Sequence, residues 1–149
     1  MAENLFINAE FFKRNIPHKQ VFDTNQVMSA VRLIQKTNLV SIISVPVYDN
    51  FQTKITSGEV FTVAEEKLFE TMQLFLAVKV AQELIDTSPS AMADNANESH
   101  LSYGNKSTLM EARIIRDINR DEDLLALAQT GTDTFDTEEM SQSGGFYFG

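Results

Sequence analysis

The 149-residue chain contains no cysteine and no tryptophan, and it has only two histidines. Without cysteine there is no disulfide framework, no thiolate metal ligand and no cysteine nucleophile. His18 and His100 are far apart, and neither has a histidine or carboxylate at ligand spacing, so no zinc site is indicated. The sequence also lacks a phosphate loop, a dinucleotide fingerprint and a nucleophile elbow. We therefore predict a protein that is not an enzyme and that has no catalytic residues, no metal and no other cofactor.

Long hydrophobic runs are absent as well. No apolar stretch approaches the roughly 20 residues that a helix needs to cross a bilayer. The first ten residues lack the basic-then-apolar order of a signal peptide. We expect a protein that is made in the cytoplasm and has no membrane partner and no small-molecule substrate.

Basic residues are scarce in the second half of the chain. Residues 1–60 hold six Lys or Arg and five Asp or Glu, whereas residues 61–149 hold six and sixteen, and no basic residue follows Arg120. The net charge is −9. Such acidity disfavours tight binding of nucleic-acid phosphates, which requires Lys and Arg to displace counterions. A solvated surface tuned for solubility is the simplest explanation of the charge.

Apolar residues recur at helical spacing along most of the chain, which predicts an all-α fold. Asn8 is expected to cap a short helix, and Asp23 or Thr24 to cap a first long helix that includes residues 39–45 as its end. Pro46 suits the first turn of a shorter helix, which Gly58 ends. The expected core positions of these last two helices are Val27, Met28, Val31, Ile34 and Ile42, followed by Val47, Tyr48, Phe51 and Ile55.

Residues 62–65 (Thr-Val-Ala-Glu) form a capping box, which predicts the start of a helix that runs to about Asp86. Between Leu74 and Ala81 only Lys79 is polar, so this helix is expected to be central and packed by several neighbours. Residues 87–107 are rich in Ser, Asn, Ala, Asp and Gly, which predicts a long surface loop.

A second capping box, residues 108–111 (Thr-Leu-Met-Glu), predicts the start of the last helix. That helix would run to about Gln129, contain the acidic residues 121–123 in its interior, and end at Gly131. Its expected apolar positions are Ile114, Ile115, Ile118, Leu124, Leu125 and Leu127.

The predicted architecture is a small helical bundle of three long helices plus one or two short ones, with extended N- and C-terminal arms. Residues 1–131 would form the bundle domain and residues 132–149 a flexible acidic C-terminal arm. Aromatic residues at the tip of an acidic arm have two explanations: they fold back onto their own bundle, or they dock on a neighbouring subunit. Burial of two rings would yield about 3–5 kcal/mol before ordering costs. The candidate partner-binding residues are Leu5, Phe6, Ile7, Phe135, Phe146, Tyr147 and Phe148.

The order of these features resembles the head–tail connector (adaptor) proteins of tailed phages, especially crAss-like and related phages of Bacteroidetes. The resemblance covers about residues 5–129. It begins with residues 5–7, the short helix and the residues 15–17 (Asn-Ile-Pro) that follow it, and is strongest over residues 45–51 (Val-Pro-Val-Tyr-Asp-Asn-Phe). Residues 55–60 and 62–68 continue it. The specificity lies in the order of the motifs, because none of them is unique to the family.

The resemblance implies a structural subunit of the virion neck, in a dodecameric ring that docks between the portal protein and further ring or tail proteins. Double-stranded DNA would pass through such a ring without specific binding, and an acidic channel would repel its phosphates. A second interpretation is a helical protein-binding or regulatory adaptor with no viral role, which would use a groove lined by Phe69, Met72 and Phe75. Portal, capsid and tail genes beside this gene would favour the connector.

Overall fold

The computed structural model describes residues 3–16, 23–87 and 96–130, and within these ranges the chain is helical between short connections, with no strand. The prediction of an all-α protein is therefore confirmed. Residues 122–130 form a further helix after the last labelled one. The labelled elements are α1 (Ala9–Asn15), α2 (Thr24–Ile34), the π-helical turn η1 (Gln35–Leu39), α3 (Val40–Ile43), α4 (Val45–Ser57), α5 (Val63–Thr87) and α7 (Ala96–Arg120).

The expected caps of the first helices are present. The Asn8 side chain accepts a hydrogen bond from the Phe11 N–H at 2.7 Å, and the Asp23 side chain accepts one from the Asn25 N–H at 3.0 Å. Gly58 ends α4 with a φ of 78°, a left-handed conformation that glycine adopts without a Cβ clash. These contacts confirm where α1, α2 and α4 begin or end.

The helix that comprises α2, η1 and α3 changes its buried face at η1. A five-residue step separates the buried Ile34 from the buried Leu39, because a π-helical turn contains one more residue than an α-helical turn. Ile42, an expected core position, is half-buried and packs against the core, whereas the fully buried residue of this turn is Ile43. The chain then turns at Ser44, whose φ is 81°, into α4.

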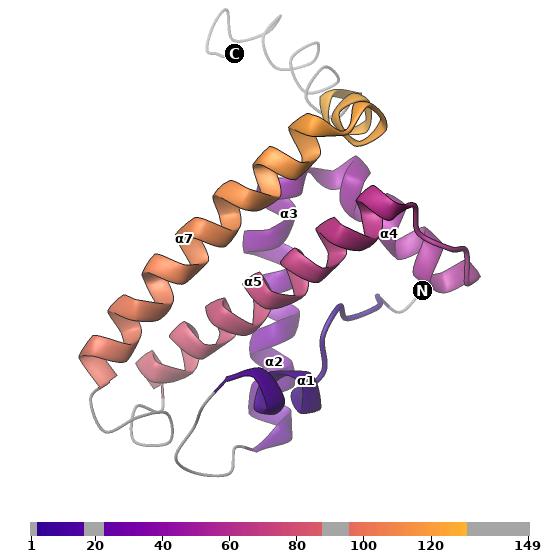
Figure 1. Cartoon of the computed structure of the whole chain (residues 1–149). Coiled ribbons are helices and arrows are strands. Elements are labelled where there is room, and N and C mark those ends of the chain that lie inside the picture. The colour runs from indigo at the N-terminus through magenta and orange to yellow at the C-terminus, as the bar shows by residue number, and fades with distance from the viewer. Residues whose placement is uncertain (1–2, 17–22, 88–95, 131–149) are drawn as a thin grey trace, which may run out of the picture.

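The two longest helices, α5 and α7, lie side by side and run in opposite directions, and the helix formed by α2, η1 and α3 packs behind them (Figure 1). α5 is central, as its composition predicted, because α1, α2 and α7 all pack against it. Six of its side chains are completely buried: Leu68, Met72, Phe75, Leu76, Val80 and Ala81. The core of the protein therefore follows α5.

α7 begins twelve residues before the predicted capping box at Thr108, so the prediction of a loop over residues 87–107 is wrong from Ala96 onward. The small residues that suggested a loop lie instead where α7 approaches α5. Ser107 is buried and its hydroxyl donates to the Gly104 carbonyl at 2.9 Å, while a Cβ at Gly104 would meet Gln82 of α5 at 3.1 Å. Thr108 is inside the helix and donates to the same carbonyl at 3.0 Å. Small side chains here serve close helix packing rather than a turn.

The prediction that the acidic residues 121–123 lie inside the last helix is wrong, because α7 ends at Arg120. The Asp121 carboxylate accepts a hydrogen bond from the Leu124 N–H at 3.0 Å, so it caps the helix of residues 122–130. Of the predicted core positions of this region, Ile114, Ile118 and Leu124 are buried, whereas Ile115 is exposed. Gly131 and the predicted arm of residues 132–149 lie outside the described residues.

Candidate functional site

The N-terminal segment, residues 3–7, lies against η1 and α4 and is held there by a buried glutamine. The Gln35 side chain is completely buried. Its oxygen accepts from the Phe6 N–H at 2.7 Å, and its amide nitrogen donates to the Asn4 carbonyl at 2.8 Å and to the Tyr48 hydroxyl at 2.9 Å. A buried amide with all these contacts fixes the path of the segment, since each unmade contact would carry a desolvation cost.

A second glutamine, Gln52 of α4, repeats this arrangement nearer the surface. Its oxygen accepts from the Asn4 N–H at 2.9 Å, and its amide nitrogen donates to the Asn4 carbonyl at 2.8 Å and to the Tyr48 hydroxyl at 3.1 Å. Asn4 also donates to the Thr56 hydroxyl at 2.8 Å. Both backbone polar groups of Asn4 therefore find partners on side chains that are far away in the sequence.

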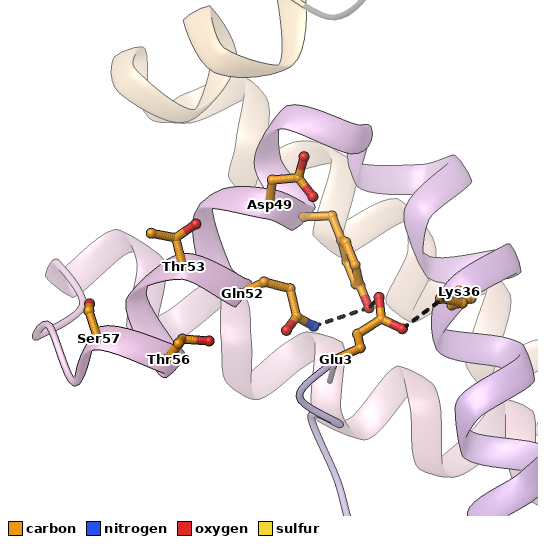
Figure 2. A pocket seen from close by; sticks show the side chains of 8 residues that line it. Glu3, Lys36, Asp49, Gln52, Thr53, Thr56 and Ser57 are labelled. Carbon is orange, nitrogen blue, oxygen red and sulfur yellow. Dashed lines mark hydrogen bonds and ion pairs between the residues drawn. The ribbon is translucent and has the colours of Figure 1, made fainter. Parts of the chain in front are cut away.

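A cavity of about 440 Å³ opens beside this network (Figure 2). The Tyr48 hydroxyl donates to the Glu3 carboxylate, which also lies 3.7 Å from the ammonium group of Lys36. Burial, together with the hydrogen bond and the negative charge of Glu3, raises the pKa of Tyr48 to about 12, against the opposing effect of the Gln35 and Gln52 hydrogen bonds. The other lining residues are Asp49, Gln52, Thr53, Thr56 and Ser57.

The polar groups around this cavity hold the N-terminal segment in place. Tyr48 is protonated at neutral pH, as tyrosine ordinarily is, and its raised pKa keeps it a hydrogen-bond donor to Glu3 well into the alkaline range. Glu3 is occupied by Tyr48 and Lys36. Glu3, Tyr48, Gln35 and Gln52 thus satisfy one another, and they tie the N-terminal segment to η1 and α4.

Contacts between aromatic rings also attach the N-terminal segment to the core. The Phe6 ring lies 5.0 Å from that of Phe69, 5.5 Å from that of Tyr48 and 6.3 Å from that of Phe51, measured between centroids. Phe61 adds an edge-on contact with Phe51 at 5.2 Å. Contacts of this kind between rings contribute about 0.5–1.5 kcal/mol each beyond the burial of their area.

The structure places the candidate residues Leu5, Phe6 and Ile7 in this region. Phe6 and Ile7 are buried among the chain's own residues, and Leu5 is half-buried at the edge of a small cavity. Their role in partner binding stays a prediction. The roles of Gln35 and Gln52 were not predicted from the sequence. A signal for Gln35 was present, because this polar residue lies four positions after Val31 and four before Leu39, on a helix face that is otherwise apolar.

The groove proposed for the adaptor interpretation is closed. Met72 and Phe75 are completely buried in the core, and Phe6 packs on Phe69. These three residues therefore do not line an open groove, and the N-terminal segment is what covers Phe69.

The capping box at the start of α5 is confirmed and forms part of a larger polar cluster. The Glu65 carboxylate accepts from the Thr62 N–H at 2.8 Å, and the Glu65 N–H donates to the Thr62 hydroxyl at 3.1 Å. Lys54 of α4 lies 2.7 Å from the same carboxylate and Asn50 donates to it at 2.7 Å. Burial would raise the pKa of Glu65, but the contacts with Lys54, Thr62 and Asn50 outweigh burial and lower it.

Beyond this cluster, the turn between α4 and α5 exposes large apolar side chains. Val60 and Val63 are 83% and 88% exposed, and the exposed Glu59 and Glu66 flank them. We call these four residues the turn surface.

α7 carries a second exposed surface of different character. Lys106, Leu109, Arg113, Arg116 and Arg120 follow one another at alternating steps of three and four residues, which places them in one line along the helix. All five are exposed, Leu109 to 68%. We call this line the basic stripe; it holds four cations in a chain whose net charge is −9.

Several residues of interest lie outside the described structure. Phe135, Phe146, Tyr147 and Phe148 fall within residues 131–149, and His18 falls within residues 17–22. Among the residues that are described, no group of three or more His, Asp or Glu could hold a metal ion. None of the helices in the same ranges combines the length and hydropathy that a membrane crossing requires.

No family model, curated protein or solved structure matches the chain.

Proposed function

We propose that the protein is a structural subunit of a phage head-to-tail connector ring. In this proposal residues 1–131 form a helical bundle and residues 132–149 an acidic arm, and the ring sits between the portal protein and further neck or tail proteins in the virion. The order of motifs over residues 5–129 supports the proposal, as does the position of the motifs: residues 45–51 form the start of α4, and residues 62–68 the capped start of α5.

One observation carries the proposal furthest: the chain has two different exposed surfaces that suit contacts with other proteins. The turn surface joins apolar side chains to carboxylates, whereas the basic stripe joins an apolar side chain to cations. The basic stripe begins at the far end of the molecule from the α4–α5 turn and runs along α7 toward the start of α5, where Arg120 and Ala64 line one cavity (Figure 1). A subunit in a closed ring uses two unlike surfaces in this way, because its contacts with its two neighbours are heterologous.

The acidic balance of the chain is compatible with DNA passage. Residues 61–149 carry a large excess of Asp and Glu, and a channel lined by such residues repels phosphate groups. DNA would then move through the ring without a specific contact.

The test is assembly with a portal protein encoded by the same genome. We expect the full chain, mixed with assembled portal, to give a complex that carries a ring of this subunit when it is measured by light scattering and imaged by cryo-electron microscopy. The double variant Val60→Asp, Val63→Asp should lose the complex, because charge is placed in an apolar contact. Ser29→Asp, at an exposed position of α2, is the matched control and should retain it.

A chain that stays monomeric and binds no portal would overturn the connector proposal. Equal binding by the wild type and the Val60→Asp, Val63→Asp variant would show that the turn surface takes no part.

A further inference from the structure

The cations of the basic stripe of α7 have only local contacts in the described residues, and each of these contacts stays within α7. Arg116 lies 3.8 Å from Asp117 of its own helix, and the Lys106 ammonium lies 5.5 Å from the ring of Tyr103. No described segment covers the outer side of α7, which forms one edge of the molecule in Figure 1. Leu101, 66% exposed, lies nearer the start of the helix and about a quarter of a turn around it from Leu109.

We infer that the acidic C-terminal segment, residues 131–149, docks on the basic stripe of its own chain in the isolated subunit. The segment has no Lys or Arg, and four acidic residues precede its aromatic tip: Asp133, Asp136, Glu138 and Glu139. The stripe offers Arg and Lys for these carboxylates and the exposed Leu109 for the rings of residues 146–148. Both kinds of side chain in the segment therefore find a matching partner on one helix face.

The connection has the length that this docking needs. The described chain ends at Thr130, in the helix that follows α7, so the segment starts near the C-terminal end of the stripe. Its 19 residues can span about 60 Å when extended, whereas the whole of α7 measures about 37 Å. The aromatic tip can thus reach Leu109 when the segment runs antiparallel to α7.

The segment of the same chain is a better occupant of the stripe than a second copy or DNA. A covalent tether gives the segment an effective concentration near the millimolar range at its own stripe, which exceeds that of free copies in dilute solution. DNA would match the cations but not the exposed leucines, and the net charge of −9 repels it. Docking in the isolated subunit does not depend on the connector proposal, and it would keep the stripe covered until assembly.

Because the chain has no cysteine, single cysteines can be introduced for labelling without background reaction. We would introduce spin labels at Asn105→Cys, an exposed position of α7 beside the stripe, and at Ser143→Cys, and measure their separation by double electron–electron resonance. The control pair, Thr53→Cys with Ser143→Cys, reports on the exposed side of α4. We expect a narrow short-distance peak for the first pair and a defined but longer distance for the control pair, because a docked segment holds a fixed place relative to both α7 and α4. The peak should persist when labelled chains are diluted into unlabelled protein.

The triple variant Arg113→Gln, Arg116→Gln, Arg120→Gln should lose the short-distance peak. Raising the ionic strength of the wild type should weaken the same peak, which provides a test without any substitution in the stripe. Three results would overturn the inference: a broad distribution for both pairs, a peak that disappears on dilution because the occupant belongs to a second copy, or a peak that the triple variant and high salt leave unchanged. Binding of duplex DNA to the stripe while the segment stays distant would also overturn it.

Discussion

α5 and α7 are both 25 residues long and lie side by side, yet they are opposite kinds of helix. α5 is buried on nearly all sides, because α1, α2 and α7 surround it. α7 buries one line of residues, which includes Ser107, Ile114 and Ile118, and leaves the basic stripe in solvent. Most of the packing energy therefore belongs to α5, and the surface available for partners belongs to α7.

The largest expected effect compares a buried ring of α5 with an exposed leucine of α7. Phe75→Ala should lower the free energy of unfolding by about 3–5 kcal/mol, since it leaves a cavity in the core. Leu109→Ala should change it by no more than about 0.5 kcal/mol. Urea unfolding followed by circular dichroism measures both. Equal losses would contradict the division of roles between the two helices.

A smaller effect concerns the way α5 is attached at its start. Glu65→Gln should cost about 1–3 kcal/mol at neutral pH, because the Lys54 ammonium and the Thr62 N–H lose a charged acceptor. The lowered pKa of Glu65 means that the carboxylate stabilises the fold above the ordinary pKa of glutamate, about 4.3, and that this stabilisation is lost as the pH falls through the folded-state value. Glu65→Gln should therefore lose less stability than the wild type between pH 7 and pH 3.

The matched control for this measurement is Glu66→Gln, at an exposed position of the same helical turn. Thermal unfolding midpoints of the three proteins at both pH values provide the readout. A Glu65→Gln variant as sensitive to acid as the wild type would exclude Glu65 as a source of the acid sensitivity.

The smallest effect compares two threonines in similar sequence patterns. Thr62→Ala should cost about 1 kcal/mol, because it removes the cap of α5. Thr108→Ala should cost nothing and can raise stability by up to about 0.7 kcal/mol, because alanine is the better residue inside a helix. Chemical denaturation of the two variants distinguishes the positions. A loss at Thr108 equal to that at Thr62 would mean that α7 begins at Thr108.

This pair of threonines also shows what the sequence could and could not predict. Thr62 follows Gly58 and precedes an apolar helix, so local patterns agreed on a helix start there. At Thr108 the same pattern was misleading because Gly104 and Ser107, which favour loops in isolation, serve the approach of α7 to α5. Contacts between helices that are far apart in sequence decided that region, and no local signal reports them.

The hydrogen bonds that attach the N-terminal segment could not be predicted from the sequence for a related reason. Gln35 occupies a core position whose partners, Asn4 and Phe6, lie some thirty residues away. The all-α class, the caps of α1, α2 and α4 and the central place of α5 follow from spacing and capping chemistry. The position of residues 3–7 depends on pairing across the fold, which a single sequence does not display.

The π-helical turn at residues 35–39 has a consequence for how this chain should be aligned with any relative. A π turn holds one residue more than an α-helical turn, which is the geometry that a single inserted residue requires if the helix is not to break. A relative that lacks the insertion would have a continuous α-helix whose buried face does not shift. Its residue 42 would then occupy the place in the core that Ile43 holds here. An alignment made without a gap in this region would pair the wrong isoleucines, although the two proteins shared one ancestor.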